Sequence, residues 1–231
     1  MVEALTASGA QAVVLTPAHQ WPTGVVLAPE RRHQLLAWGG LIIEDDYDAE
    51  FRYDRQPVGA LQGLAADRVF LLGTVSKTLA PVLRLGWVIC PPGWAGRVAG
   101  QKALLDRGSP ALDQVALAIL IELGRFDRHL RQMRGIYAHR PAALVAAVGR
   151  HAPQIRLTGL DAGFHAIAHL PAGAKEESLV AAARERGVGL YGMSGNVLGA
   201  ATSGPCLVMG FGNVREQAID QGVAALADLL R

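Results

Sequence analysis

The amino-acid sequence predicts an α/β protein with a mostly parallel sheet, followed by a smaller α+β domain. In the first half of the 231-residue chain, short apolar runs alternate with a helical segment and polar loops, as in strand–helix–strand units. Three of these runs end in polar side chains, and open α/β sheets bind ligands beyond the carboxyl ends of their strands. The second half mixes strands and helices, and we expect domains at residues 1–125 and 126–231.

The predicted elements of the first domain follow from local signals. Residues 12–15 form a short apolar run. Residues 28–38 are predicted to form a helix, because Pro29 stands near its start and two glycines follow its end. Three more strands are predicted at residues 41–43, 69–72 and 85–90.

The predicted second domain begins within a helical region that has no Pro-, Gly- or Ser-rich linker. An apolar helix at residues 112–123 is followed by a longer, amphipathic and basic helix at residues 128–148. Beyond it the sequence predicts strands at 155–157, 163–170 and 206–210, and helices at 175–186 and 215–230. This mixture indicates an α+β organisation.

The composition is that of a globular protein with little net charge. The chain is 51% hydrophobic and 18% charged, and its 22 basic and 20 acidic residues give a formal charge of +2. It can therefore form a substantial core, and no basic cluster indicates nucleic-acid binding. The most basic stretch, residues 125–134, is interpreted as a solvated helix face, with contact to phosphate or to a partner as the alternative.

The sequence does not predict secretion or membrane insertion. Its N-terminus lacks a basic region followed by a long apolar core, and no apolar run reaches membrane-spanning length. Cys90 and Cys206 lie in predicted apolar strands as small hydrophobic residues. This favours a reducing compartment and a cytoplasmic location.

Lys77 is the most informative residue of the chain. It follows the predicted strand at residues 69–72, with Thr74 and Ser76 before it and Arg84 after it. A lysine in such a position usually extends into water, but a site can instead use its neutral amine as a nucleophile. A Schiff base with a carbonyl cofactor requires such an amine.

Two other predicted strands also end in polar residues. The strand at 41–43 leads into an acidic segment that contains Tyr47, and the strand at 12–15 leads into the loop TPAHQWPTG. Because strand side chains alternate between faces, Asp45 and Tyr47 are expected on one face and Asp46 on the other. Taken singly, a capping or surface role is the favoured interpretation of Asp45, and simple packing that of Tyr47.

These segments resemble the fold-type-I, pyridoxal-phosphate-dependent aminotransferase family. Within it they are most similar to the aminotransferase-like domain of MocR/GabR-type transcriptional regulators. The matching segments are TPAHQWPTG, IIEDDYDAEFRYDRQPVGALQG and LGTVSKTLAPVLRLGW, in the same order and spacing. The resemblance is dense over residues 11–90 and looser beyond. It implies a partial cofactor-binding large domain at residues 1–125 and a small C-terminal domain at 126–231.

The resemblance implies a role for each matching residue. Lys77 would be the catalytic residue, forming a Schiff base with the aldehyde of pyridoxal 5′-phosphate. Asp45 would pair with the protonated ring nitrogen, and Tyr47 would hydrogen-bond the phenolic oxygen of the ring. The phosphate would be held by Thr74, Ser76 and Arg84. A carboxylate and a guanidinium suit the ring nitrogen and the phosphate, respectively.

The resemblance also sets expectations for the whole protein. Family members carry further residues ahead of the matching segment, so we expect this chain to be the C-terminal part of a longer protein, lacking some strands and one wall of the site. The regulators bind DNA through an N-terminal winged-helix domain that this chain is expected to lack. A homodimer and a small amino acid, amine or pyridoxal-phosphate-like effector are also implied, without a membrane partner.

Two departures from the family pattern bear on activity. Many aminotransferases have an Asn at the position of Trp21, so Trp21 is expected only to line a wall. The strand near Cys206 and Leu207 lacks the Arg that binds a substrate carboxylate, and Arg215 is expected at the surface. A sensor with low activity is therefore favoured, and a genuine class I/II aminotransferase is the alternative.

A metal site is a third hypothesis. Mg²⁺ could be bound by Glu44, Asp45, Asp46 and Asp48, with Lys77 and Arg84 neutralising a phosphoryl group, but Tyr47 would then have no role. His165 and His169 share a predicted strand face, and a packed or exposed pair is favoured over a metal pair. No dinucleotide-, nucleotide- or zinc-binding motif occurs in the sequence.

Overall fold

The computed structural model describes residues 2–48, 50–53, 59–197 and 204–231, which divide between two compact units. Unit 1 comprises Met1–Gln20, Val26–Glu50 and Gln56–Met133. Unit 2 comprises Trp21–Val25, Phe51–Arg55 and Arg134–Arg231. The chain thus passes between the units several times, and its last passage falls within one long helix. The domain boundary near residue 125 stays a prediction.

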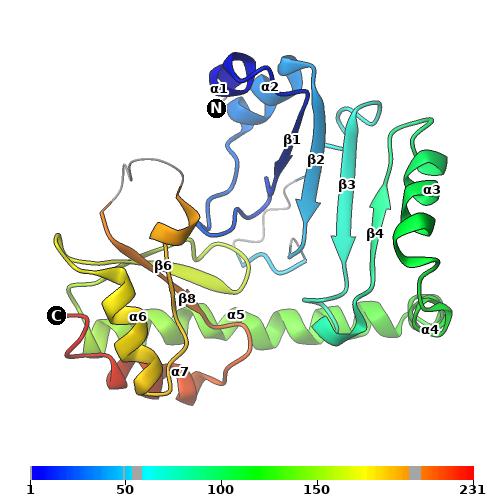
Figure 1. Ribbon diagram of the computed structural model, residues 1–231. Helices are drawn as coiled ribbons and strands as arrows, with labels where there is room; N and C mark the ends of the chain where they lie inside the picture. The colour runs from blue at the N-terminus through cyan, green and yellow to red at the C-terminus, as the bar shows by residue number, and fades with distance from the viewer. Residues whose placement is uncertain (1, 49, 54–58, 198–203) are drawn as a thin grey trace. The chain divides into compact units, whose positions relative to one another are not determined.

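Unit 1 is built on a four-stranded sheet (Figure 1). Its strands are β1 (Ala12–Leu15), β2 (Leu41–Asp46), β3 (Val69–Thr74) and β4 (Gly86–Ile89), in that spatial order. The first three are parallel and β4 is antiparallel to β3. The prediction of a mostly parallel sheet is therefore confirmed, with an antiparallel strand at one edge.

Helix α2 (Pro29–Trp38) covers one face of this sheet. Leu35 of α2 packs with Ile42 of β2 and Val69 of β3, and all three are fully buried. Helix α1 (Val2–Ala7) adds Leu5 to the margin of this cluster. Arg32, on the buried side of α2, donates to the carbonyl oxygens of nearby loops at Leu27, Gly59 and Pro17. The helix therefore contacts loops that follow both β1 and β2, as well as the sheet.

The part of unit 1 that follows β3 contains few buried side chains. All four residues of β4 are exposed, and neither α3 (Ala95–Asp106) nor α4 (Ala111–Glu122) has a buried residue. Helices α1 and α3 were not predicted from the sequence. The composition of α3, with Gly96 and Gly100 among small and charged residues, gives only a weak helical pattern.

Helix α5 (Arg125–His151) is the longest of the described elements and includes Pro141. The predicted helix at 128–148 lies within it. Among the described residues, no helix combines the length and apolar character needed to cross a membrane.

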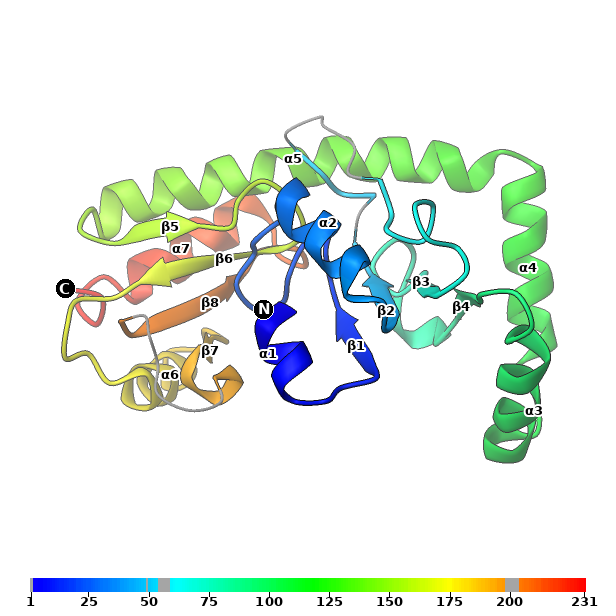
Figure 2. The same ribbon diagram turned by 90° about the horizontal axis from the view of Figure 1, so that it is seen from above.

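Unit 2 contains an antiparallel sheet in the order β5-β6-β8-β7. Its strands are β5 (Arg156–Thr158), β6 (His165–His169), β7 (Tyr191–Gly192) and β8 (Cys206–Gly210). Figure 2 shows α5, α6 (Glu176–Glu185) and α7 (Glu216–Ala225) beside this sheet. Buried residues of all three helices, including Leu144, Ala183 and Ile219, pack with Leu207 and Met209 of β8. Unit 2 therefore has a core shared by its sheet and helices.

The loop TPAHQWPTG enters unit 2 at Trp21. Gly24 has a φ of 68°, and a Cβ atom there would lie 2.7 Å from the Cα atom of Gly159. Only a glycine permits both this left-handed conformation and this close backbone approach. The glycine of the loop therefore has a packing role within unit 2.

Candidate functional site

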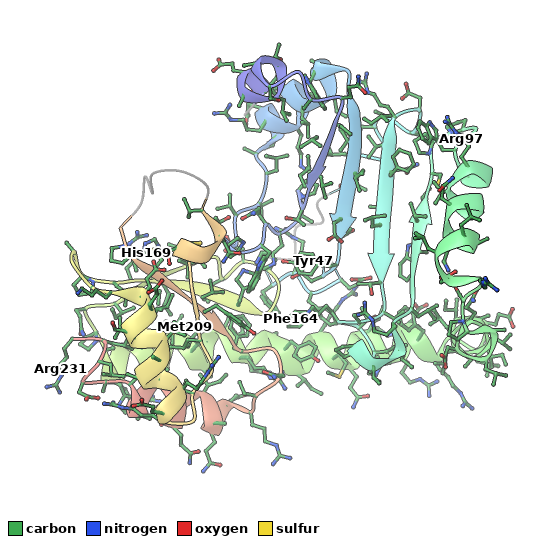
Figure 3. The ribbon with its side chains drawn as sticks, in the orientation of Figure 1. Tyr47, Arg97, Phe164, His169, Met209 and Arg231 are labelled. Carbon is green, nitrogen blue, oxygen red and sulfur yellow. The ribbon has the colours of Figure 1, made fainter. Side chains whose placement is uncertain are left out.

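The predicted site residues lie at the carboxyl ends of neighbouring strands in unit 1. Asp45 is in β2, and Tyr47 follows the end of this strand (Figure 3). Thr74 is the last residue of β3, with Ser76 and Lys77 in the turn beyond it. Asp46 pairs with Gly73 in the parallel register. The sheet therefore places the acidic segment next to the segment that carries Lys77.

Burial along β2 separates Glu44 from Asp45, whereas Asp45 and Asp46 are both half-buried. The placement of Asp45 and Asp46 on opposite faces therefore stays a prediction. Ile42 and Glu44 are buried, whereas Asp45 is half-buried. The two carboxylate oxygens of Glu44 accept hydrogen bonds of 3.0 Å from the backbone N–H groups of Leu61 and Gln62. Glu44 is thus a structural residue. Burial, and secondarily the charge of Asp48, raise the pKa of the Asp45 carboxyl.

Tyr47 contacts the loop after β1. Its hydroxyl oxygen lies 3.1 Å from the carbonyl oxygen of His19 and 3.3 Å from His19 Nδ1. Burial raises the pKa of Tyr47 far above its usual value, and the Asp48 and Asp45 carboxylates and a hydrogen bond with Asp48 add to this shift. The hydroxyl therefore keeps its proton and can act only as a neutral donor or acceptor.

His19 and Asp48 form a buried pair that the sequence analysis did not predict. His19 Nδ1 lies 2.8 Å from Asp48 Oδ2, and the two side chains are 0% and 2% exposed. The residues are 29 positions apart and belong to the loops after β1 and β2. A His in a polar loop and an Asp in an acidic run carry no local signal of pairing, so only the fold reveals it.

The segment of residues 75–85, here called the lysine loop, is closed by hydrogen bonds at its two ends. The Thr74 hydroxyl contacts the Ser76 hydroxyl at 2.9 Å and the Leu85 carbonyl at 3.2 Å. The backbone N–H of Val75 also donates to the Leu85 carbonyl. Both predicted hydroxyls are therefore held together at the loop entrance, and Leu85, the residue after Arg84, is bonded to Thr74 and Val75.

The middle of the lysine loop is supported from α5. His129 Nε2 donates to the carbonyl oxygen of Thr78 at 2.7 Å, and the Leu79 N–H donates to Val75. This support was also missed from the sequence, where residues 125–134 were interpreted as a solvated helix face. Half-buried His129 shows that one side of that stretch is a packing surface.

Lys77 and Arg84, the two cations of the lysine loop, are both exposed. The Lys77 amine therefore reaches water in this structure. Arg84 has a φ of 48°, in the left-handed region that side chains other than glycine seldom adopt. Arg84 takes this conformation at the end of the short 3-10 helix Pro81–Leu83, where its backbone N–H donates to the carbonyl oxygen of Pro81 at 3.3 Å.

The structure does not gather the acidic residues into a metal site. Glu44 binds backbone N–H groups and Asp48 contacts His19. Within the described part of the chain, no group of three or more His, Cys, Asp or Glu residues could hold a metal ion. The magnesium hypothesis therefore gains no support from the geometry.

The two histidines of β6 are also engaged separately, both within unit 2. His165 Nε2 lies 3.1 Å from the carbonyl oxygen of Pro22, and its ring packs at 4.7 Å against Trp21. His169 contacts the Thr158 hydroxyl at 2.9 Å and the Cys206 sulfur at 3.5 Å. Burial and the charge of Arg156 lower the pKa of His169, and burial raises that of the Cys206 thiol. Both groups are therefore kept neutral near pH 7.

Comparisons of sequence relate the chain to regulators and to aminotransferases. No family model matches it. It is 37% identical to the uncharacterised HTH-type transcriptional regulator YhdI of Bacillus subtilis, covering 91% of this chain and 46% of the relative. It is 38% identical to the probable rhizopine catabolism regulatory protein MocR of Rhizobium meliloti over 79% of this chain and 38% of the relative. It is 28% identical to aromatic-amino-acid aminotransferase 1 of Thermococcus litoralis.

Comparisons of structure relate the chain to aminotransferases. An archaeal alanine:glyoxylate aminotransferase superposes with a TM-score of 0.89 at 27% identity, over 99% of this chain and 58% of that chain. Kynurenine aminotransferase of Pyrococcus horikoshii, solved in complex with PMP, gives a TM-score of 0.87 at 26% identity, with the same coverage. The chain spans about half the length of the regulators that it matches.

Proposed function

This chain is an aminotransferase-like domain of fold type I, homologous to MocR- and PdxR-type regulators, and we propose that it binds pyridoxal 5′-phosphate at the carboxyl ends of β2 and β3. Bound there, the cofactor supplies an aldehyde that links covalently to an amine and a ring that withdraws electrons. In the whole protein, this domain would sense a small amino acid, an amine or a pyridoxal-phosphate-like effector.

The carboxylate and the phenol suit the cofactor ring. The half-buried Asp45 carboxylate has a raised pKa, so its ionised form gains from a neighbouring cation such as a protonated ring nitrogen. Tyr47 keeps its proton and can donate a hydrogen bond to an anionic ring oxygen. The observation that carries the proposal is the location of this carboxylate and phenol at the end of β2, next to the segment after β3 that carries Lys77.

The lysine loop suits the remaining parts of the cofactor. Thr74 and Ser76 present two hydroxyls in mutual contact, and the exposed guanidinium of Arg84 follows at the end of the loop. Hydroxyls and a guanidinium fork are groups that bind phosphate. Lys77, exposed between them, would supply the amine for the covalent link.

Sensing is favoured over catalysis by the structure of β8. Its residues Cys206 to Met209 are buried and include no arginine, so this strand offers no guanidinium to a substrate carboxylate. The relatives of higher identity are regulators. The second candidate, a genuine class I/II aminotransferase, is supported by the TM-score of 0.89 with an aminotransferase.

Trapping the covalent link tests the proposal. The protein is incubated with pyridoxal 5′-phosphate, reduced with borohydride, digested and analysed by mass spectrometry. We expect a stable adduct on Lys77, and complete loss of that adduct in Lys77→Ala. The chain has only two other lysines, Lys102 and Lys175, so Lys102→Ala and Lys175→Ala are matched controls that should retain it. An adduct spread equally over the three lysines would refute a specific site.

An activity assay separates the two candidates. For a sensor, we expect little or no amino transfer from amino acids to 2-oxo acids, while added amino acids or amines change the absorbance of the bound cofactor. Robust turnover would favour the aminotransferase. The homodimer, the cytoplasmic location and DNA contact through a winged-helix domain outside this chain stay predictions about the whole protein.

A further inference from the structure

We propose that the buried His19–Asp48 pair is a positioning element of the cofactor site, which holds the Tyr47 hydroxyl in place as a hydrogen-bond donor. The inference rests on the proposed function, because Tyr47 meets the ring only if the cofactor binds. It concerns two residues that do not themselves contact the proposed cofactor, and it assigns them a function beyond packing.

The burial of the pair calls for an explanation. Both side chains are withdrawn from water, at 0% and 2% exposure. Desolvating two such groups costs free energy, and apolar residues of similar size often stabilise a protein as well or better. A buried pair of this kind is therefore weak as a source of stability. A role in fixing one arrangement of neighbouring groups accounts for it better.

The hydrogen-bond geometry shows which group that arrangement serves. An ionised carboxylate accepts but cannot donate, so His19 Nδ1 must carry the proton of the 2.8 Å contact with Asp48. Because that nitrogen is a donor, it cannot accept the proton of Tyr47. The Tyr47 hydroxyl is left to donate to the His19 carbonyl oxygen at 3.1 Å or to Asp48. Within the described part of the chain, the contacts of the hydroxyl are therefore with His19 and Asp48.

The same geometry would allow the Tyr47 hydroxyl to donate a hydrogen bond to a ligand. Rotation of the O–H group about the C–O bond of Tyr47 would allow its proton to leave an acceptor in the pair and be donated to an anionic ring oxygen of a bound cofactor. The negative charge of Asp48 opposes ionisation of the phenol, so the group offered to the ring remains a donor. His19 in turn fixes Asp48 by joining the loops that follow the neighbouring parallel strands β1 and β2.

A double-mutant cycle on cofactor binding tests this role. The four proteins are the wild type, Tyr47→Phe, Asp48→Asn and the double variant, with cofactor affinity and the absorption maximum of the bound cofactor as readouts. We expect each single variant to weaken binding about tenfold, the effect of losing one hydrogen bond of ordinary strength, and to shift the absorption maximum in the same direction. In the Tyr47→Phe background, Asp48→Asn should cost less than about twofold.

The outcomes separate this inference from the proposed function. No Lys77 adduct in the wild type would overturn both. A normal adduct with additive losses, or with Asp48→Asn indistinguishable from wild type, would overturn the positioning role alone. An additive loss would mean that the pair only supports the fold, because a purely structural element does not depend on the Tyr47 hydroxyl.

Two further variants guard against a simple folding defect. His19→Asn keeps a donor near the position of Nδ1 and should largely retain affinity and the absorption maximum, whereas His19→Ala should behave like Asp48→Asn. Thermal melting of each protein without cofactor is measured first. If His19→Asn and His19→Ala melt alike yet only the alanine variant shifts the absorption maximum, positioning is supported. Equal spectra for the two variants would contradict it.

Discussion

The two compact units differ in how completely they bury their sheets. In unit 2, four of the five residues of β6 and of β8 are buried, and α5, α6 and α7 contribute to the same core. In unit 1, β4 is exposed along its whole length, and α3 and α4 bury no residue. The central strands of unit 1 instead end in polar groups. The stability of the fold is therefore expected to depend most on unit 2, and its chemistry on unit 1.

The largest expected effect compares apolar residues of the two units. Phe211 is 1% exposed in unit 2, and Leu105 is 87% exposed on α3. Phe211→Ala should lower the free energy of unfolding by about 3–5 kcal/mol, because it removes a buried ring and leaves a cavity. Leu105→Ala should change it by less than about 0.5 kcal/mol. Denaturant unfolding measures both values. Equal losses would show that α3 is covered in solution.

The next largest loss of stability is expected on replacing a carboxylate that accepts hydrogen bonds from two backbone N–H groups. Each unit has a carboxylate that binds in this way. Glu44 does so at Leu61 and Gln62 in unit 1, and Glu176 at Ser194 and Cys206 in unit 2. Replacement by Gln leaves one N–H facing an amide donor. We expect a loss of about 1–3 kcal/mol for the buried Glu44→Gln, and a smaller loss for the partly exposed Glu176→Gln. The reverse order in denaturant unfolding would contradict the assigned difference in burial.

A smaller change in the free energy of unfolding, this time a gain in stability, is expected for a substitution in the lysine loop. Thr78 is 2% exposed, and among the described residues its hydroxyl has no hydrogen-bond partner. Thr78→Val should therefore stabilise the protein by about 1 kcal/mol, because it removes an unsatisfied buried polar group. Thr158→Val in unit 2 is the matched control. Its hydroxyl contacts His169 at 2.9 Å, so melting temperature should fall there. Destabilisation by both would indicate a missed partner of Thr78.

The smallest expected effect is on the pH dependence of stability, which should have opposite signs for one carboxyl group of unit 1 and one of unit 2. The pKa of Asp45 is raised in the folded state, so ionisation of this carboxyl opposes folding, and stability falls as pH rises above about 3.8 through the folded pKa. Asp45→Asn should thus raise the melting temperature at neutral pH while weakening cofactor binding. The pKa of Asp220 is lowered by hydrogen bonds with Arg150 and His151. The stabilisation that the ionised Asp220 gives the folded state is present above pH 3.8 and is lost as pH falls below that value. Asp220→Asn should therefore slightly lower the melting temperature at neutral pH. Changes of the same sign would contradict this contrast.

Much of the fold could be predicted from local patterns. The strands at 12–15 and 206–210 were predicted with the observed bounds, and the helix at 128–148 lies within α5 despite Pro141. The short strand β7 and helix α3 were missed, because two residues or a Gly-containing segment carry too little periodicity. The antiparallel direction of β4 was not predicted either, since strand direction depends on the partner rather than on the strand's own residues.

The candidate site also combines features that were predicted from the sequence with contacts that were not. Strand alternation assigned Asp45 and Tyr47 to one face and Asp46 to the other, which stays a prediction. No pattern in the sequence indicated the role of Glu44 at Leu61 and Gln62. The contacts that complete the site join residues far apart in the chain, such as His19 with Asp48 and His129 with Thr78. The trapping experiment tests the predicted covalent link between Lys77 and the cofactor.

The sequence by itself determined the types of residue available at the strand ends: an amine, a carboxylate, a phenol and a guanidinium, in an order that also identified the family. Those features are local, since strand periodicity and motif spacing involve residues close together in the chain. Only the tertiary structure decided which groups are withdrawn from water and which atoms they meet. Desolvation and hydrogen bonding depend on every segment that packs around a group. For this reason the neutral Tyr47 and the buried His19–Asp48 pair could be recognised only after folding had brought the loops of β1 and β2 together.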